Sequence, residues 1–360
     1  MAATFVLPPR YKPITGTLVR GGYGAVQAVE DLYLGRKVLF KEMFDPANNA
    51  QLLTEIQALS KARSRHVVEL YDVLRDRDGQ VAGIVMEYLT GRDFSGFSSE
   101  ARTDCTGFLK LVYQLASALT DLHSAGVIHR DIKLDNFKES ASRLLKLFDF
   151  GISVVGPTYR TKENRGTLIY AAPELFIPGA IITREMDMYA LGICAWMLFS
   201  KTLPQELKDV PPQNKGLAPS IDTASPNELP AEIVHAINNC LSVDSAARPS
   251  ALAVRDTIGK YLVRGKHKGL FVHGVETIFE LSHANPHVRL KIGDLGMISV
   301  NYDGLRFVIA EVSGNVYINN QRAAVTMELP EACVLTYGDP ALGSGRAWPT
   351  FSSSHPEVIS

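Results

Sequence analysis

The chain has 360 residues, of which 46% are apolar and 21% are charged. This length allows two domains with sizeable cores, and the composition is ordinary for a globular protein. The formal net charge is −1, so no global basic field would recruit nucleic acid or an anionic membrane, and we expect neither as a partner.

The first part of the chain is expected to be mostly β with one helix. Apolar stretches alternate with glycines over 14–41 and include four β-branched valines, which predicts short antiparallel strands joined by tight turns. Apolar residues recur at helical spacing over 47–62. Two further strands are predicted at 67–74 and 81–88, with Asp78-Gly79 as the turn between them.

The middle of the chain is expected to be helical. Residues 107–124 place their apolar side chains on one stripe, and Gly126 follows as a stop signal. Further helices are predicted at 184–200, 230–241 and 250–262. The segment 202–230 is rich in Pro, Asn and Ser, which predicts a long surface excursion.

The last hundred residues have a different, β-rich residue pattern. Strands at 297–302, 305–312 and 315–319 are separated by Asp-Gly and Ser-Gly, which predicts a three-stranded meander within a β domain over 265–342. The tail, 343–360, shows no period and is expected to be mobile. GNVYINN followed by LTYGD is faintly similar to the end of a forkhead-associated domain, but the earlier features of that family are absent. We therefore prefer an unassigned regulatory or targeting module.

The sequence shows few features that indicate a cellular compartment or a membrane-spanning segment. The four cysteines lie far apart without metal-ligand spacing, which indicates reduced thiols in a cytoplasmic protein. The N-terminus lacks the pattern of a secretory signal. The most apolar stretch, 188–199, is too short to span a bilayer and is expected to form a buried helix.

Several short motifs carry the chemical information. Residues 129–137 read HRDIKLDNF, in which an acid, cations and a carboxamide crowd a segment entered from apolar residues. Residues 149–151 read DFG, 171–174 read AAPE and 38–41 read VLFK, while Glu55 falls inside the first predicted helix. Each motif alone could be a charged turn or strand end, but their joint order is specific.

In this order the motifs resemble those of the eukaryotic-type serine/threonine protein kinase family over residues 11–264. The resemblance implies an α+β, two-lobed fold, with a β-rich N-lobe at about 11–90 and a helical C-lobe at about 91–264. An N-terminal extension, 1–10, precedes these lobes, and the small C-terminal β domain follows them.

The resemblance also implies a phosphoryl-transfer site. Lys41 would hold the α- and β-phosphates of ATP and pair with Glu55, while Asp149 and Asn136 would bind Mg²⁺, or Mn²⁺ in its place. Asp131 would accept or orient the proton of the attacking hydroxyl, and Lys133 would lie near the γ-phosphate. Such residues are needed because the reaction concentrates negative charge on phosphate oxygens.

The glycine-rich loop, 19–26 (VRGGYGAV), departs from the family pattern. Val19 stands where the first glycine is expected, which puts normal ATP affinity in doubt. By resemblance, the remaining nucleotide-facing positions of the loop are Gly21, Gly22, Tyr23, Gly24 and Val26. Glycines there let backbone amides approach phosphate closely.

The predicted strand 83–88 leads into a hinge. By resemblance Met86 is the gatekeeper beside the adenine, and a large flexible side chain there would narrow the back pocket. The carbonyl of Glu87 and the amide of Leu89 would bond the adenine edge.

Further positions follow from the same resemblance. Thr167 would brace the catalytic Asp, Glu174 would pair with Arg248, and Asp187 would orient the catalytic loop. Arg130 would bind a phosphate on the activation segment, where Thr158 and Thr161 are the candidate sites.

These patterns favour an ATP-dependent kinase acting on protein Ser/Thr hydroxyls and on its own activation segment. A pseudokinase scaffold without turnover is the alternative that Val19 supports, although Lys41, Glu55, Asp131, Asn136 and Asp149 are all retained. Phosphorylation of a small molecule is a second alternative, disfavoured by Thr167 and the APE segment.

Overall fold

The computed structural model divides into two compact units, Met1–Ile258 and Gly259–Ile359. The residues that the structure describes are 6–20, 24–43, 49–94, 105–156, 159–160, 168–200, 202–224, 229–274, 277–354, 356 and 358. The division between the units falls inside helix α6 (Ala251–Leu262), whereas the sequence patterns predict a boundary after residue 264.

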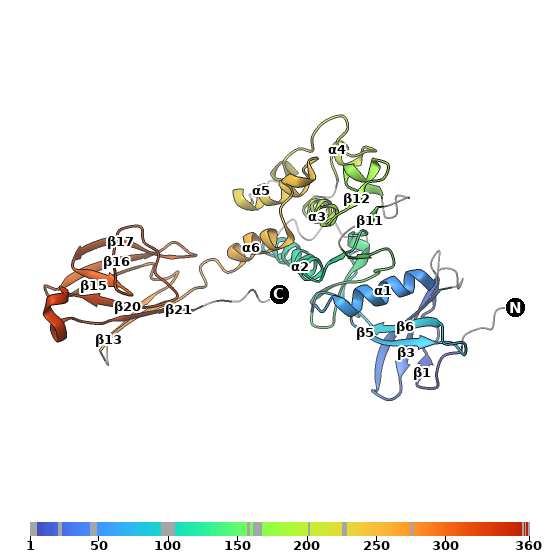
Figure 1. Cartoon of the computed structure of the whole chain (residues 1–360), viewed down its shortest axis with the longest axis horizontal. Helices are drawn as coiled ribbons and strands as arrows, with labels where there is room; N and C mark the ends of the chain where they lie inside the picture. Colours follow the sequence, from blue (N-terminus) through green and yellow to red (C-terminus); the bar gives the residue numbers. More distant parts are fainter. Residues whose placement is uncertain are drawn as a thin grey trace. The chain divides into compact units, whose positions relative to one another are not determined.

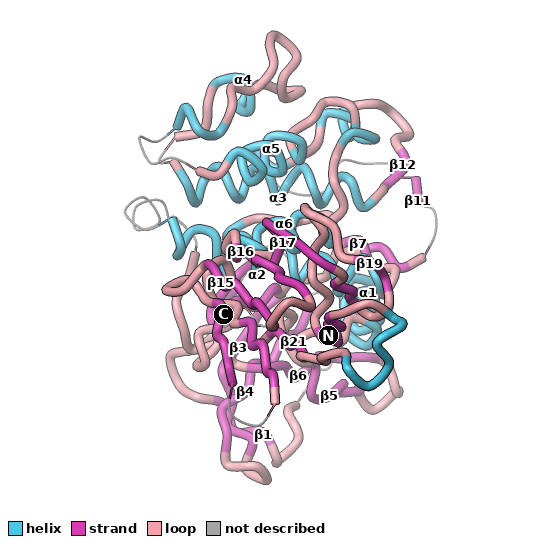
Figure 2. Tube along the Cα trace, turned by 90° about the vertical axis from the view of Figure 1, so that its left-hand side faces the viewer, coloured by secondary structure: helices cyan, strands magenta, loops and turns pink. Residues whose placement is uncertain are grey.

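The first lobe is built on an antiparallel sheet in the order β1-β3-β4-β6-β5, with β2 pairing with β3 beside that path. Its strands are β1 (Tyr11–Pro13), β2 (Val19–Arg20), β3 (Gly24–Asp31), β4 (Arg36–Met43), β5 (Leu70–Arg75) and β6 (Val81–Glu87). Figure 2 shows β1 and β3–β6 grouped apart from helices α3–α5 of the second lobe. The predicted β-rich first lobe is therefore confirmed.

The two faces of this sheet are covered differently. Helix α1 (Asn49–Lys61) lies against β4, β5 and β6 and buries Leu52, Ala58 and Leu59 (Figure 1). Successive residues of a strand point to opposite faces of the sheet. Lys41 of β4 points toward α1, so its neighbour Phe40 points away from that helix. Phe40 belongs to a second apolar cluster, against which Leu7 of the N-terminal segment packs.

The second lobe is helical, as predicted. Its longer helices are α2 (Cys105–Ser124), α3 (Arg184–Phe199), α5 (Ala231–Cys240) and α6, and the short helix α4 (Gln205–Lys208) lies in the predicted surface excursion. Helix α3 packs between α2 and α5, and every residue from Met186 to Trp196 is buried. The expectation of a buried helix over 188–199 is therefore confirmed.

Three small two-stranded sheets connect these helices. They are β7 (Val127–Ile128) with β10 (Val154–Val155), β8 (Phe137–Glu139) with β9 (Leu145–Leu147), and β11 (Tyr159–Arg160) with β12 (Ile181–Ile182). The first two carry the HRD and DFG segments at their ends, so their pairing brings those segments together.

The C-terminal unit is a two-sheet β structure with its own core. One sheet has the order β14-β13-β21-β20-β18-β19 and the other the order β15-β16-β17. Residues of both sheets, among them Phe271, Leu335, Phe351, Ile298 and Ile309, form one buried cluster, so the sheets pack face to face. The strands are β13 (Gly269–His273), β14 (Thr277–Leu281), β15 (His287–Ile292), β16 (Gly296–Tyr302), β17 (Phe307–Gly314), β18 (Val316–Ile318), β19 (Gln321–Arg322), β20 (Ala332–Tyr337) and β21 (Thr350–Ser353).

Two predictions for this unit are wrong. The expected meander holds only for the β16/β17 hairpin, because β18 pairs with β19 and β20 in the other sheet. The expected mobile tail contains β21, which lies between β13 and β20. Phe351 of β21 is 1% exposed, so this strand is part of the core.

Among the described residues, no helix combines the length and the apolar character that crossing a membrane would require.

Candidate active site

The HRD segment is fixed through its backbone. Asp187 of α3 is fully buried and accepts hydrogen bonds from the amides of His129 (2.9 Å) and Arg130 (2.8 Å). His123, at the end of α2, lies 3.0 Å from the same carboxylate through Nε2. Arg130 has a positive φ of 71°, a backbone conformation that a non-glycine residue adopts at a cost and that clusters at functional sites.

The next residues form a compact polar cluster. Lys133 Nζ donates to Asp131 Oδ2 at 2.7 Å. Asn136 is buried and its Nδ2 donates to the backbone oxygen of Asp131 at 2.8 Å and to Oδ2 at 3.1 Å. One carboxylate thus has a cation and a carboxamide as partners, which fixes its orientation.

A second cluster joins the two lobes. Lys41 of β4 donates from Nζ to Glu55 Oε2 of α1 at 2.7 Å and to Asp149 Oδ1 at 3.0 Å. Glu55 is almost fully buried, whereas the Asp149 side chain is 48% exposed. The lysine is therefore held by a buried carboxylate and points toward an accessible one.

The β8/β9 hairpin brings the two clusters together. Phe137 pairs with Leu147, and the amide of Phe148 donates to the oxygen of Asn136 at 3.0 Å. Asn136, which enters β8, and Asp149, which follows β9, therefore lie at the same end of the hairpin. Asp149 also has a positive φ, of 66°.

The DFG phenylalanine is packed inward. Phe150 is fully buried, and its ring meets that of His129 with centroids 4.6 Å apart, edge to face. Burial lowers the pKa of His129, so this ring is neutral at pH 7 and suits an apolar contact. The contact links the DFG and HRD segments behind their charged residues.

The charged groups of the site shift one another's pKa values toward the charged forms. Burial alone would lower the pKa of the Lys41 ammonium, but Glu55 and Asp149 raise this pKa above its ordinary value. Burial alone would raise the pKa of the Asp149 carboxyl, but Lys41 holds this pKa below its ordinary value. Both groups are therefore charged at neutral pH.

The donor set fits a divalent cation that arrives with phosphate. Mg²⁺ in such sites is held by one or two carboxylates, with water and phosphate oxygens completing its shell. Asp149 offers a half-exposed carboxylate and Asn136 a carboxamide at the same end of the hairpin. Within the described ranges, no group of three or more His, Cys, Asp or Glu residues could hold a metal by itself.

The glycine-rich loop is described at its ends. Val19 pairs with Val26, and Val19 is 62% exposed. A Cβ added at Gly24 would collide with the backbone oxygen of Glu42, so the close approach of β4 requires glycine there. Gly21, Gly22 and Tyr23 lie outside the described residues.

The residues predicted to form the hinge lie at the end of the first sheet. Met86 pairs with Leu39 of β4 and is buried, and Leu89 is also buried. Glu87 is the last residue of β6, and its amide donates to the oxygen of Glu69 at 2.9 Å.

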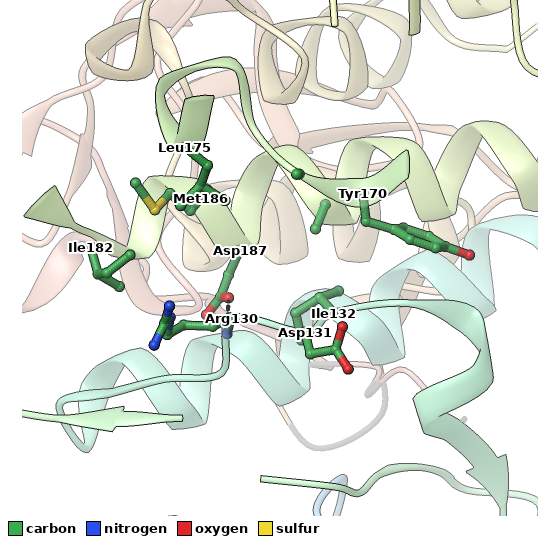
Figure 3. A pocket seen from close by; sticks show the side chains of 10 residues that line it. Arg130, Asp131, Ile132, Tyr170, Leu175, Ile182, Met186 and Asp187 are labelled. Atoms are coloured by element: carbon green, nitrogen blue, oxygen red, sulfur yellow. Dashed lines mark hydrogen bonds between the residues drawn. The ribbon is translucent and has the colours of Figure 1, made fainter. Parts of the chain in front are cut away.

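Arg130 and Asp131 point to different sides of the HRD segment, as Figure 3 shows. The guanidinium of Arg130 lies toward Ile182 and Met186, and its Nη1 donates to the oxygen of Ile152 at 3.4 Å. Between these groups and Tyr170 is a cavity of about 20 Å³, which has room for little more than a water molecule. The predicted Thr158, Thr161 and Thr167 lie outside the described residues.

Glu174 and Arg248 form a two-pronged ion pair. Arg248 Nη1 and Nη2 donate to the two carboxylate oxygens at 2.7 and 2.8 Å, and the Arg248 side chain has no exposed surface. Tyr189 of α3 lies under the guanidinium, with its centroid 4.9 Å from Cζ. The pair ties the APE segment to the loop before α6.

Two polar contacts were not foreseen from the sequence. His123 reaches Asp187, and Lys146 of β9 reaches Glu87 Oε2 at 2.7 Å. A charged residue within LLKLF was the available signal for the second contact, because a lysine flanked by buried apolar residues needs a partner.

Comparison with known proteins agrees with this geometry. Residues 14–257 match the protein kinase domain family, which covers more than half of the chain. The chain belongs to the protein kinase family. The predicted two-lobed kinase fold is thereby confirmed.

Similar proteins include several named kinases. The chain is 29% identical over 208 residues to the NUAK family SNF1-like kinase 1 of Mus musculus, covering 55% of this chain and 31% of that protein. It is 30% identical over 202 residues to the maternal embryonic leucine zipper kinase of Xenopus laevis, covering 54% and 31%. It is 27% identical over 252 residues to the probable serine/threonine-protein kinase WNK6 of Oryza sativa subsp. japonica, covering 67% and 57%. The match thus spans about a third to somewhat over half the length of these relatives.

Proposed function

We propose that the chain is an ATP-dependent protein kinase that transfers the γ-phosphoryl group of Mg·ATP to Ser/Thr hydroxyls of protein substrates. The observation that supports this most is the meeting of two charged clusters at one end of the β8/β9 hairpin. They are Lys41 with Glu55 and Asp149, and Asp131 with Lys133 and Asn136.

Each residue has a part in this proposal. Lys41, held by Glu55, binds the α- and β-phosphates. Mg²⁺, when bound, would supply positive charge that offsets the negative charge of the phosphates. Asp149 and Asn136 would hold that ion.

The cluster of Asp131, Lys133 and Asn136 acts on the nucleophile. Asp131 accepts or orients the proton of the substrate hydroxyl, and its fixed carboxylate does so without reorganisation. Lys133 stabilises charge that develops near the γ-phosphate. The backbone of Glu87 and Leu89 bonds the adenine, and Met86 borders its back pocket.

Specificity for serine and threonine rests on Lys133 and Thr167 by family resemblance. Among similar proteins, WNK6 and the Gallus gallus kinase SIK2 carry serine/threonine-protein kinase in their names. Phosphoamino-acid analysis of a phosphorylated general substrate tests this point. A product containing only phosphotyrosine would overturn it.

The decisive experiment is a transfer assay with radiolabelled ATP. Wild type is expected to label a general protein substrate, and Asp149→Ala and Asp131→Asn are expected to lose that activity. Asp135→Asn is the matched control, because Asp135 is an exposed acid in the same loop. If wild type binds ATP without turnover, the pseudokinase reading suggested by Val19 is the correct one.

We also propose that the kinase phosphorylates its own activation segment at Thr158 or Thr161 and that Arg130 binds the resulting phosphate. A guanidinium can clamp a phosphate and thereby order a segment. Mass spectrometry of active protein should find phosphate there. Thr158→Ala/Thr161→Ala should lose activity toward added substrate but still bind ATP, and full activity in this variant would refute the idea.

A further inference from the structure

A buried lysine lies behind the hinge, outside the two clusters described above. Lys146 is in the middle of β9, and its side chain is only 7% exposed. Its Nζ donates to Glu87 Oε2 at 2.7 Å and lies 3.4 Å from the oxygen of Val67. The Glu87 side chain is 18% exposed, so the ion pair is largely withdrawn from water.

The partners of this pair come from both lobes. Glu87 ends β6 of the first sheet, and its carboxylate also accepts the amide of Glu69 at 3.3 Å. β9 belongs to the hairpin that carries Asp149 and Asn136. The side-chain contact therefore connects the nucleotide-binding edge of one lobe with the metal-binding hairpin of the other.

The backbone around Lys146 is itself fixed. Leu147 donates from its amide to the oxygen of His66 at 2.9 Å, and its oxygen accepts the amide of Val68 at 3.0 Å. Val67 and Leu147 form a parallel bridge. Lys146 therefore projects from a rigid support, and its ammonium has a defined position relative to Glu87.

A lysine is a costly choice at this position. Its neighbours Leu145 and Leu147 are buried, and an apolar residue in its place would need no partner. Buried ion pairs are weak contributors to stability but can select one conformation over others. The conformation that this pair selects is that of the residue from which the hinge starts.

We propose that Lys146 is a positioning residue for nucleotide binding. By fixing the Glu87 side chain, it orients the backbone of Glu87 and the following residues, which bond the adenine. The first part of this inference is that Lys146 fixes Glu87, and the second is that this positioning serves nucleotide binding. The second part rests on the proposed function, because the hinge matters to catalysis only if ATP binds there. It assigns Lys146 no contact with the nucleotide.

The main test compares Lys146→Met with wild type. Methionine keeps the unbranched shape and removes the charge. Calorimetric titration with Mg·ADP, which has no γ-phosphoryl group to transfer, should show about tenfold weaker binding, equivalent to 1.4 kcal/mol. In the transfer assay KM for ATP should rise by a similar factor, while kcat at saturating ATP and KM for the protein substrate stay within about twofold.

Lys138→Met is the matched control. Lys138 is the residue opposite Lys146 in the β8/β9 hairpin, so the control changes the same residue type on the adjacent strand. It should bind Mg·ADP as wild type does. Glu87→Gln is the second variant. Its loss of affinity for Mg·ADP should not add to the loss caused by Lys146→Met in the double variant, since both substitutions remove the same interaction.

Amide hydrogen exchange separates this inference from the proposed function. In the free protein, Lys146→Met should speed exchange over 84–92 and leave α3 unchanged. If the variant exchanges and binds as wild type does, or if kcat and melting temperature fall while KM stays constant, Lys146 is not a positioning residue. If wild type itself does not bind Mg·ADP, the proposed function fails, and the exchange result alone decides whether Lys146 fixes the hinge.

Discussion

At the residue scale, Lys41 illustrates how a charge can be kept in place without being neutralised. Its two carboxylate partners raise the pKa of the ammonium, so the charge persists throughout the neutral range. Only Glu55 of these partners is buried, and Asp149 remains accessible. The arrangement leaves a fixed cation facing the space that phosphates would enter.

Replacing Lys41 by methionine should therefore abolish transfer but not folding. We expect a loss of activity on the order of 10²- to 10³-fold, because a preorganised charge is removed from the site of developing charge. The measurement is the radiolabel assay together with thermal melting. Lys37→Met, on the same strand but exposed, is the control. Near-normal activity in Lys41→Met would remove this residue from the mechanism.

Asp187 should affect stability in a pH-dependent way. Burial alone would raise the pKa of this carboxyl, but the hydrogen bond and charge of His123 hold the pKa below its ordinary value of 3.8. A carboxyl with a lowered folded-state pKa stabilises the fold above its unfolded pKa, and that contribution is lost as pH falls through the folded value.

Asp187→Asn should accordingly cost about 3 kcal/mol of unfolding free energy near neutral pH, since buried donors lose a charged acceptor. The difference from wild type should shrink as pH falls below about 4. Urea unfolding of both proteins at pH 6, 4 and 3 measures this. A difference that is constant over this range would show that the carboxylate charge is not what Asp187 contributes.

At the element scale, the N-terminal segment before β1 takes part in the first lobe. Leu7 packs against the second apolar cluster of the sheet, to which Phe40 belongs, and Arg10 donates to both oxygens of Asp31 at 2.9 and 2.8 Å. The sequence patterns predict residues 1–10 to be an N-terminal extension that precedes the lobes. The contacts show that its last residues cover apolar strand surface.

Removing residues 1–10 should lower the melting temperature, because the Leu7 contact and the anchoring of the segment by Arg10 are both lost. Removing only 1–5 is the control, and Leu7→Ser in the full chain should reproduce part of the effect. Thermal melting followed by circular dichroism measures all three. An unchanged midpoint in the longer truncation would mean that the segment contributes nothing to the fold.

Sequence patterns located the helices well and the strand pairings poorly. The α2 stripe and the apolar run of α3 have a period or composition that local physics determines, and both helices begin and end within about two residues of prediction. The pairing of β18 is decided by partners far along the chain. TFSS in β21 shows one apolar residue among polar ones, so its place between two strands left no local signal.

The same distinction holds for the site. The motifs HRDIKLDNF and DFG could be recognised because phosphoryl transfer dictates their residue types. In contacts such as Lys146 with Glu87, or His123 with Asp187, the partner could not be foreseen, because it depends on which distant segments the fold brings together. The sequence therefore predicted the charged residues better than the residues that hold them.

At the scale of the whole molecule, each of the two compact units buries apolar residues of its own. Those of the first unit support the kinase lobes, and those of the second lie between the two sheets of the C-terminal unit. Each unit is therefore expected to fold as a domain. The fragments 1–264 and 265–360 should thus each be soluble and unfold cooperatively, and 1–264 should retain binding of Mg·ADP.

Phe351 allows the two units to be separated within the full chain. Its ring is fully buried against Phe271 and Phe307, with centroids 4.8 and 5.3 Å away, and its strand fills the gap between β13 and β20. Phe351→Ala should destabilise the C-terminal unit by about 3–5 kcal/mol through the cavity it leaves. Calorimetric melting of Phe351→Ala should show a lower melting temperature for the C-terminal unit and the wild-type melting temperature for the kinase unit. Added Mg·ADP should raise the melting temperature of the kinase unit only. Leu270→Ala, at an exposed position on the neighbouring strand, is the control. A single transition that shifts as a whole in Phe351→Ala would instead show that the two units unfold together.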